Sequence, residues 1–190
     1  TSRRQRQMCI RDSYKVVAGS DNIEITELVN DSRKVVPGSV FVCISGAVSD
    51  GHQYVKDVAE RGAAAVIVEK DVEVPEGLTV IKVENTRYAL ALMSAAYFGY
   101  PAEKLKTIGI TGTKGKTTTT YMVKAILEEV GHKVGLIGTI EAIIGDKTIP
   151  SNNTTPESYT IQKYFAQMVE AGCDCCLLYT SPSPTRLDVI

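Results

Sequence analysis

The segment TIGITGTKGKTTTT, residues 107–120, has the residue types of a phosphate-binding loop. Its glycines let the backbone turn sharply, so that several N–H groups can point at one anion. Lys116 can reach the terminal phosphates of a nucleotide, and the hydroxyl of Thr117 suits Mg²⁺. We therefore predict a nucleotide site around Lys116, with Thr117 as a metal ligand.

This loop departs at one position from the strict Walker pattern, which has a glycine where this chain has Ile110. A turn rich in glycine and threonine that binds nothing is the alternative interpretation. The flanking residues favour the nucleotide site, because a β-branched run precedes the loop and an amphipathic helical pattern follows it. The N-terminus of such a helix attracts anions. Phosphate binding is therefore the prediction, while the reaction it serves stays open at this point.

The elements before the loop alternate between strand and helix patterns. Short β-branched runs bounded by turn residues predict buried strands, and apolar residues at helical spacing predict the helices between them. The predicted strands are 40–44, 64–68 and 79–83, and the predicted helices are 52–61 and 86–98. This alternation indicates an α/β fold with a parallel sheet. We place a domain boundary at about residues 100–106, where glycine, proline and charges cluster.

The loop opens a second α/β unit. The helix after it carries Val123, Ile126, Leu127 and Val130 on one predicted buried face. Strand residues follow at 133–144, with Gly145 and Asp146 as a hairpin turn. A further helix is predicted to begin with Thr155 as N-cap and Pro156 as its first residue, before a last strand from residue 174. The buried stripe expected on that helix is Ile161, Tyr164, Phe165 and Met168.

Composition excludes several classes of protein. The 190 residues carry 21 Lys and Arg against 22 Asp and Glu, which argues against a general nucleic-acid binder or a membrane-surface protein. No apolar run of transmembrane length and no secretory signal pattern occurs. Five cysteines without framework spacing fit a reducing compartment. We expect a cytoplasmic monomer with no membrane insertion and no nucleic-acid partner.

The two ends, residues 1–12 and 176–190, have unusual sequences. Gln-Met-Cys-Ile-Arg-Asp at 7–12 and Cys-Leu-Leu-Tyr-Thr-Ser at 176–181 can be encoded by reverse-complementary DNA. Both also resemble translated sequencing-library adapter. We expect both ends to be non-native; a pair of disordered tails is the alternative. The two histidines, His52 and His132, are not predicted to form a catalytic or metal site, and His132 is expected to interact with a helix C-terminus.

Three segments carry a resemblance to a known family. GTKGKTTT at 112–119 resembles the nucleotide loop of the Mur ligases, whose pattern GT-x-GKT[ST] lacks the early Walker glycine. Residues 30–55 resemble the uridine-binding front of the UDP-N-acetylmuramoyl-tripeptide synthetases, the MurE branch, and 151–158 resemble their second substrate loop. The likeness spans about residues 14–175. It implies a UDP-sugar-binding α/β domain at 13–101, followed at 102–175 by the front part of the ATP-binding central domain.

The resemblance also implies the roles of individual residues. ATP is expected to contact Gly112, Thr113, Lys114, Gly115, Lys116, Thr117 and Thr118, with Lys116 as the catalytic residue and Thr117 on Mg²⁺. UDP-N-acetylmuramoyl-peptide is expected to contact Ser32, Ser49, Asp50, Asn153, Thr154 and Thr155. Two alternatives stay open. Thr155 can act as a helix cap alone. Asp31 and Arg33 can form a local surface salt bridge.

The implied reaction is ATP-dependent amide formation in peptidoglycan synthesis. A diamino acid, meso-diaminopimelate or L-lysine, is added to UDP-N-acetylmuramoyl-L-alanyl-D-glutamate after ATP has phosphorylated its D-glutamate carboxylate. We expect the 190-residue chain itself to be inactive, because the family's metal-holding Glu and its third domain have no counterpart in it. The alternatives are another ligase of the superfamily, such as a folylpolyglutamate synthetase type, a P-loop kinase or GTPase, and a UDP-sugar or nucleotide binding module without catalysis.

Overall fold

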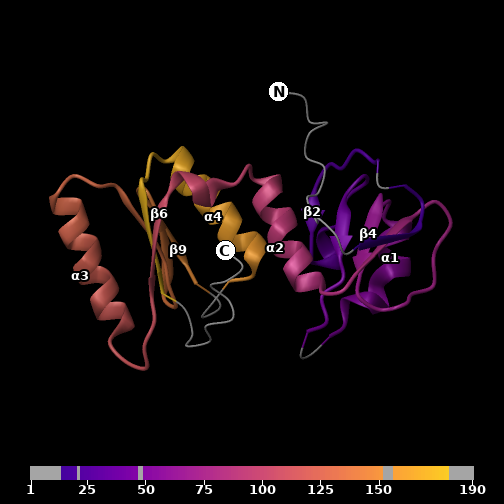
Figure 1. The fold of residues 1–190 in the computed structure, drawn as a ribbon, viewed down its shortest axis with the longest axis horizontal. Helices are drawn as coiled ribbons and strands as arrows, with labels where there is room; N and C mark the ends of the chain where they lie inside the picture. Colours follow the sequence, from indigo (N-terminus) through magenta and orange to yellow (C-terminus); the bar gives the residue numbers. More distant parts are fainter. Residues whose placement is uncertain (1–13, 21, 47–48, 152–155, 180–190) are drawn as a thin grey trace. The chain divides into compact units, whose positions relative to one another are not determined.

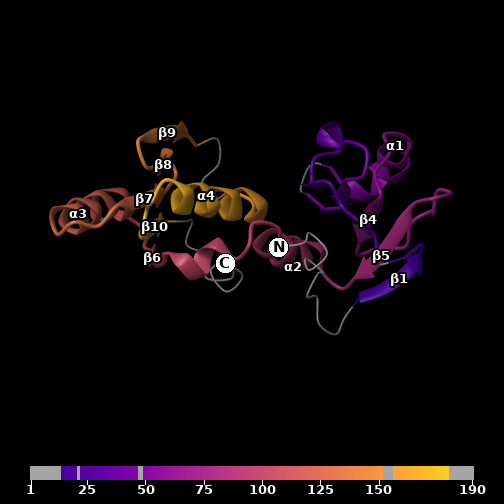
Figure 2. The ribbon, with the colours of Figure 1, turned by 90° about the horizontal axis from the view of Figure 1, so that it is seen from above.

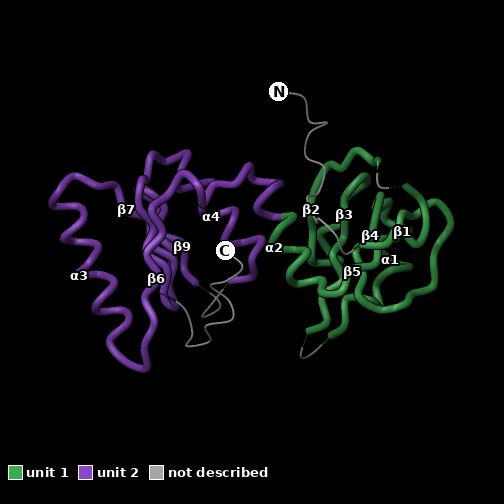
Figure 3. Tube along the Cα trace, viewed as in Figure 1, with its two compact units in different colours: residues 1–93 green, residues 94–190 purple. Residues whose placement is uncertain are grey.

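A computed structural model describes residues 14–20, 22–46, 49–151 and 156–179. The chain divides into two compact units, residues 1–93 (unit 1) and 94–190 (unit 2), shown in Figure 3. The division falls inside helix α2 (Thr86–Tyr97), a few residues before the predicted boundary at 100–106. Each unit has its own sheet, so each is described by itself. No helix in these described ranges has the length and apolar character needed to cross a membrane.

Unit 1 is built on a five-stranded sheet in the order β1-β5-β4-β3-β2 (Figure 1). Its strands are β1 (Tyr14–Ala18), β2 (Leu28–Val29), β3 (Val40–Val42), β4 (Ala65–Val68) and β5 (Thr79–Val83). Strands β2 to β5 are parallel, and β1 adds to β5 in the antiparallel direction. The three strands predicted for this part of the chain are therefore confirmed, as is the parallel sheet.

The helical pattern predicted at 52–61 forms two elements. A 3₁₀ turn, η3 (Gly51–Tyr54), leads into helix α1 (Val55–Glu60), and a second 3₁₀ turn, η2 (Ser32–Lys34), follows β2. Val55 and Val58 of α1 join a buried cluster with Phe41, Val66 and Val80 of the sheet. The alternate residues of the same strands are buried too, so both faces of β3, β4 and β5 are covered. This explains their continuous apolar runs.

Unit 2 also has a five-stranded sheet, in the order β6-β10-β7-β8-β9 (Figure 2). Its strands are β6 (Lys106–Ile110), β7 (Val134–Ile137), β8 (Glu141–Ile144), β9 (Lys147–Pro150) and β10 (Cys175–Tyr179). Strands β6, β10 and β7 are parallel, whereas β8 and β9 form the predicted hairpin around Gly145. Its helical elements are η4 (Pro101–Lys104), α3 (Lys116–Glu129) and α4 (Ser158–Glu170).

Strand β10 has its side chains alternating between the two helices of unit 2. Cys175 and Leu177 pack with Val123 and Leu127 of α3. Cys176 and Leu178 belong to the cluster that contains Phe165 and Met168 of α4. The period of two along a strand therefore separates two apolar layers, and the cysteines of β10 serve as small core residues.

Helix α3 corrects one prediction. Ile126 is 64% exposed and Val130 is 68% exposed, although both were predicted on the buried face with Val123 and Leu127. An α-helix turns by about 100° per residue, so Ile126 and Leu127 lie on opposite sides of Val123 around the helix axis. Leu127 faces the sheet with Val123, whereas Ile126 is turned toward solvent. Val130 is the C-cap, beyond the last helical residue. The apolar stripe of α3 is thus narrower than the pattern indicated.

Helix α4 corrects another. Its N-cap is Glu157, so the predicted cap at Thr155 and first residue at Pro156 are wrong. The reason is local, because Glu157 has an extended backbone, with ψ at 154°, and the helix cannot include the residues before it. The predicted stripe is confirmed, since Ile161, Phe165 and Met168 are buried and Tyr164 packs against the same cluster.

Candidate nucleotide and substrate sites

The glycine-rich loop lies between the carboxyl end of β6 and the N-terminus of α3, as predicted. Gly112 has φ of 152° and Gly115 has φ of 77°, conformations that side chains beyond glycine rarely adopt. Gly115 is the N-cap of α3, so Lys116 and Thr117 begin the helix. The first N–H groups of a helix have no partner within it, and here they follow the loop directly. This arrangement can hold a phosphate.

The side chain of Lys116 folds back over the loop. Its Nζ donates a hydrogen bond of 2.6 Å to the carbonyl of Gly112. Thr113, Lys114 and Thr118 are exposed around it. The structure thus brings the predicted ATP-binding residues together at one turn, with the ammonium of Lys116 above the backbone. A nucleotide phosphate could replace the carbonyl as the partner of that ammonium.

Thr117 has an unexpected neighbour at the carboxyl end of β10. The hydroxyls of Thr117 and Tyr179 lie 3.5 Å apart, and Tyr179 pairs with Ile110 at the end of β6. Tyr179 is buried, and its ring packs against Gly138. A Cβ at position 138 would lie 2.1 Å from the ring, so a larger residue there would clash with it. P-loop enzymes hold Mg²⁺ with the loop Ser or Thr and a carboxylate from a neighbouring strand. This chain has a phenol there.

One carboxylate of the same sheet, that of Glu141 in β8, already has a hydrogen-bond partner. Glu141 accepts a hydrogen bond from the phenol of Tyr121, which raises the pKa of Tyr121 to about 12. Within the described ranges no carboxylate contacts Thr117. Mg²⁺ prefers an octahedral shell of oxygens that usually includes one or two carboxylates. These donors do not fit a resident Mg²⁺, and its binding by Thr117 stays a prediction.

A second group of potential metal ligands lies at the amino ends of β7 and β10. His132, Asp174 and Cys175 place their ligand atoms within 4.8 Å of one another. The Asp174 carboxylate accepts hydrogen bonds from His132 Nδ1 at 2.6 Å and from the N–H of Lys133 at 3.0 Å. The bond from His132 lowers the pKa of Asp174, whereas burial raises the pKa of Cys175. The hydrogen-bonding capacity of the Asp174 carboxylate is thus used by His132 and Lys133. We interpret the group as a structural link between the turns before β7 and β10, not as a metal site.

In unit 1, Ser32 is the first residue of η2, directly after β2. The neighbouring carboxylate of Asp31 accepts from the backbone N–H of Arg33 at 3.1 Å and pairs with its guanidinium at 2.9 Å. The hydrogen bond from Arg33 lowers the pKa of Asp31. The local salt bridge considered for these two residues is therefore what the structure contains. Among the described residues, the Ser32 hydroxyl has no protein partner.

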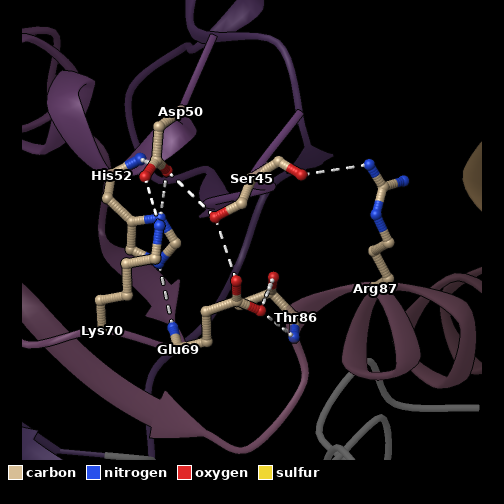
Figure 4. A network of polar contacts seen from close by, with 7 residues as sticks. All are labelled: Ser45, Asp50, His52, Glu69, Lys70, Thr86 and Arg87. Atoms are coloured by element: carbon tan, nitrogen blue, oxygen red, sulfur yellow. Dashed lines mark hydrogen bonds and ion pairs between the residues drawn. The ribbon is translucent and has the colours of Figure 1, made fainter. Parts of the chain in front are cut away.

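The loop after β3 holds the other two predicted substrate residues of unit 1. Ser49 is exposed, whereas the carboxylate of Asp50 is turned toward Ser45, His52 and Lys70 (Figure 4). Because β2 and β3 are parallel neighbours, the turns that follow them share one edge of the sheet. Ser32 and the 45–52 loop are thus at the same edge. Asn153, Thr154 and Thr155 lie outside the described residues.

Polar residues that follow the predicted strands are a weak sequence signal for part of this edge. Ser45, His52, Glu69 and Thr86 join the contacts of Asp50, but none was singled out as a site residue. Ser45, Glu69 and Thr86 follow the runs 40–44, 64–68 and 79–83 within three residues, and His52 follows the first run by eight. In a parallel sheet, polar residues just after consecutive strands meet at one edge. That rule could have grouped them.

These features define a P-loop nucleotide-binding α/β protein with a second α/β unit before the loop. Two family models match the chain, the "Mur ligase family, catalytic domain" at residues 24–98 and the "Mur ligase middle domain" at residues 110–183. The chain belongs to the Mur ligase family.

Curated relatives agree with this assignment. A Clostridium perfringens protein named "UDP-N-acetylmuramoyl-L-alanyl-D-glutamate--2,6-diaminopimelate ligase" is 46% identical over 175 residues, 92% of this chain and 36% of that protein. A Clostridium acetobutylicum ligase of the same name, numbered 1, is 47% identical over the same shares. The chain therefore spans about a third of the length of the curated relatives it matches.

Solved structures show the same fold. A structure titled as a UDP-N-acetylmuramoyl-L-alanyl-D-glutamate--2,6-diaminopimelate ligase has a TM-score of 0.68 at 21% identity and covers 88% of this chain and 34% of its own. A MurF ligase from Thermotoga maritima in complex with ADP has a TM-score of 0.53 at 23% identity, over 82% of this chain and 32% of its own. The predicted α/β fold is confirmed.

Proposed function

We propose that this chain acts within an ATP-dependent ligase that adds 2,6-diaminopimelate to UDP-N-acetylmuramoyl-L-alanyl-D-glutamate in the cytoplasm. The observation that carries the proposal is the 46% identity, over 92% of the chain, to a protein named for that reaction. The glycine-rich loop at the start of α3 supplies a site for ATP. Diaminopimelate is preferred over L-lysine because the relatives' names specify it.

The reaction has two steps. The D-glutamate carboxylate attacks the γ-phosphorus of ATP, the bond to the bridging oxygen breaks, and an acyl phosphate and ADP form. The amine of diaminopimelate then attacks the acyl carbon, loses a proton and expels phosphate, which leaves an amide. The chain's part is to bind and orient ATP, with Lys116 and the loop N–H groups opposing the charge that moves between oxygens. No step here depends on a metal held by the described residues.

Two groups of residues are proposed to contact the muramoyl substrate. We assign its uridine diphosphate part to Ser32 and to the loop with Ser49 and Asp50, at the carboxyl edge of the unit 1 sheet. The unpartnered hydroxyl of Ser32 supports this, since it can donate to a phosphate or uracil oxygen. Its muramoyl-peptide part is assigned to Asn153, Thr154 and Thr155. Separately, we expect the protein to be a monomer.

A ligand panel tests the proposal. Isothermal titration of the 190-residue chain with ATP, GTP, UDP and UDP-N-acetylmuramoyl-dipeptide should show binding of ATP and of both uridine ligands. GTP should bind at least about tenfold more weakly than ATP, because the proposed reaction uses ATP; each tenfold is about 1.4 kcal/mol. Phosphate release by the longer protein that carries this chain should require diaminopimelate. Equal binding of GTP, or none of the uridine ligands, would contradict the assignment.

A second candidate, a nucleotide and UDP-sugar binding module without catalysis, is favoured by one observation. Tyr179, which lies in the segment 176–190 that the sequence predicts to be non-native, places a phenol next to Thr117, where a metal-dependent phosphoryl transfer would need a carboxylate. The two candidates differ in turnover. If the longer protein that carries this chain binds ATP and UDP-N-acetylmuramoyl-dipeptide but releases no phosphate in the presence of Mg²⁺ and diaminopimelate, the module is supported. Phosphate release that depends on diaminopimelate supports the ligase.

A further inference from the structure

His52 is the central member of a set of polar contacts in unit 1, shown in Figure 4. Three parallel strands, β3, β4 and β5, end at this edge of the sheet. We call the set the carboxyl-edge network; it consists of Ser45, Asp50, His52, Glu69, Lys70, Thr86 and Arg87. The first three residues follow β3, the next two follow β4 and the last two follow β5. The network therefore joins three turns that are distant in the sequence.

The hydrogen bonds of His52 fix its tautomer. Its side chain is 7% exposed. Nε2 lies 3.1 Å from the backbone nitrogen of Glu69, and a backbone N–H can only donate. Nε2 must therefore carry a lone pair. Nδ1 then carries the proton and donates to Asp50 Oδ1 at 2.5 Å. The neutral imidazole with hydrogen on Nδ1 is the one form that satisfies both contacts.

Asp50 connects His52 to the rest of its own loop. Its carboxylate accepts from the backbone N–H of His52 at 3.1 Å and pairs with Lys70 Nζ at 2.6 Å. The bond from Lys70, followed by those from His52, holds the pKa of Asp50 well below its ordinary value. The Ser45 hydroxyl lies 3.3 Å from this carboxylate and 3.0 Å from that of Glu69. It has one proton, so it donates to one of them at a time.

Glu69 extends the network to the start of α2. Its carboxylate accepts from the backbone N–H of Thr86 at 3.2 Å and from its hydroxyl at 2.9 Å. Burial raises the pKa of Glu69, but the bonds from Thr86 and Ser45 outweigh it, and the net shift is downward. Arg87 donates to the carbonyl of Ser45 at 3.3 Å. The 45–52 loop is therefore held from two other turns.

Two backbone hydrogen bonds join described residues on the two sides of the loop after β3. The N–H of Gly46 donates to the carbonyl of Ser49, and that of Gly51 donates to the carbonyl of Ile44, both at 2.9 Å. A Cβ on Gly51 would lie 2.8 Å from the nitrogen of Ile44, so only glycine allows this approach. Ser49 is thus held next to Gly46, and Asp50 and His52 follow it directly in the chain.

We propose that His52 is a positioning residue for the uridine diphosphate ligand. As a neutral imidazole of fixed tautomer, it holds residues 49–52, and with them Ser49, against the ends of β3 and β4 before the ligand arrives. A loop that is already ordered loses less conformational freedom on binding, which increases affinity. The inference rests on the proposed function, because it requires unit 1 to bind the uridine part of the substrate.

Three variants of the whole chain test it. His52→Ala removes both contacts. His52→Asn can still donate to Asp50 from the position of Nδ1, and His52→Gln can still accept from Glu69 at the position of Nε2. His132→Ala is the matched control, since it removes the other histidine and its contact with Asp174 in unit 2. Titration calorimetry measures the affinities for UDP and ATP. Hydrogen exchange measures the protection of the amides at 45–52.

We expect His52→Ala to weaken UDP binding by about tenfold and to speed exchange in the loop, with ATP affinity changed by less than about twofold. His52→Asn and His52→Gln should each recover part of the UDP affinity, and His132→Ala should retain all of it. In the wild-type chain, ¹⁵N NMR at neutral pH should show a protonated Nδ1 and an unprotonated Nε2 for His52. This signature reports the tautomer and not only the presence of a fold.

The outcomes separate the inference from the proposed function. If the wild-type chain binds UDP and His52→Ala binds it within twofold, the positioning role is wrong while the proposed function stands. The opposite tautomer, or a doubly protonated ring, also overturns the inference. If the wild-type chain fails to bind UDP, both are wrong. Where His52→Ala does not fold, equal UDP affinity of wild type, His52→Asn and His52→Gln counts against the role.

Discussion

The carboxyl ends of the parallel strands are built differently in the two sheets. At the edge of unit 1, charged and polar side chains from three turns pair with one another, as between Asp50 and His52. At the edge of unit 2, the loop from Gly112 to Gly115 offers mainly backbone, and its one internal side-chain contact is from Lys116. The first edge is a shaped surface of fixed side chains, and the second is a backbone cradle that a phosphate can complete.

This difference predicts where each edge is sensitive. The unit 1 edge depends on reciprocal contacts, so removing one partner leaves another buried polar group unsatisfied. The unit 2 edge depends on backbone conformation and on one cation, the ammonium of Lys116, so replacing the exposed side chains of its loop should have little effect. Single side-chain replacements at the two edges should therefore differ in their effects on ligand affinity, on Mg²⁺ dependence and on the free energy of unfolding.

The largest effect is expected from Lys116→Ala. Removal of the ammonium that lies above the Gly112 carbonyl should weaken ATP binding by about 100-fold, because charge-assisted contacts to phosphate are among the strongest. Stability should change little, since Lys116 is only part-buried. Titration calorimetry measures the affinity, and Lys114→Ala, an exposed lysine of the same loop, is the control. Similar losses for the two variants would mean that the loop has no specific cation.

Tyr179→Glu tests the metal side of the cradle. A carboxylate at the end of β10, next to the Thr117 hydroxyl, would supply the kind of oxygen that Mg²⁺ prefers. ATP affinity of this variant should then rise by about tenfold when Mg²⁺ replaces EDTA, against about twofold for wild type. Tyr179→Phe, which loses the hydroxyl without gaining a carboxylate, should behave like wild type. A wild-type chain with a full tenfold Mg²⁺ effect would show that another group holds the metal.

These residues illustrate how far the sequence could lead. The nucleotide loop was predicted because all of its parts are contiguous, from the strand before Gly112 to the helix after Gly115. Tyr179 was missed because its contact with Thr117 depends on the pairing of β10 with β6, about 70 residues away in the chain. Local pattern does not encode that pairing.

The edge of unit 1 shows the same limit more strongly. Its strands and parallel order were predictable from β-branched runs, and Ser32 and Asp50 came from a resemblance. The roles of His52 and Glu69 arise only when turns after separate strands meet. The opposite error occurred at Thr155, where a local capping pattern was overruled by the extended backbone of Glu157. The order of the strands therefore added residues to the site, whereas the local backbone of Glu157 decided where α4 begins.

Asp50→Asn tests whether the paired edge contributes to stability. The folded pKa of Asp50 lies below its ordinary value of 3.8, so folding favours the ionised form. Its contribution is therefore complete above pH 3.8 and is lost as the pH falls through the folded pKa. At pH 7 the variant should lose about 1–2 kcal/mol of unfolding free energy, and less at pH 3.

Hydrogen exchange of the β3 and β4 amides measures this loss in unit 1 separately from unit 2. Asp71→Asn is the control, because Asp71 is 94% exposed and its pair with Lys82 should contribute little. An equal loss at pH 7 and pH 3 for Asp50→Asn would show that the charge of Asp50 is not what stabilises the edge.

The smallest effect is expected from Arg33→Ala, at the same edge but outside the carboxyl-edge network. Its guanidinium is 85% exposed and pairs only with the neighbouring Asp31 among the described residues. Exposed pairs of this kind contribute little to stability, so exchange of the β3 amides should stay within error. UDP affinity should change by less than about twofold, whereas Ser32→Ala should reduce it more, because that hydroxyl is a proposed direct ligand contact. A larger loss of UDP affinity for Arg33→Ala than for Ser32→Ala would show that the ligand contacts the guanidinium of Arg33 and not the hydroxyl of Ser32. The unit 1 edge would then bind its ligand through an exposed cation, as proposed for Lys116 in unit 2, and the contrast between the two edges would be lost.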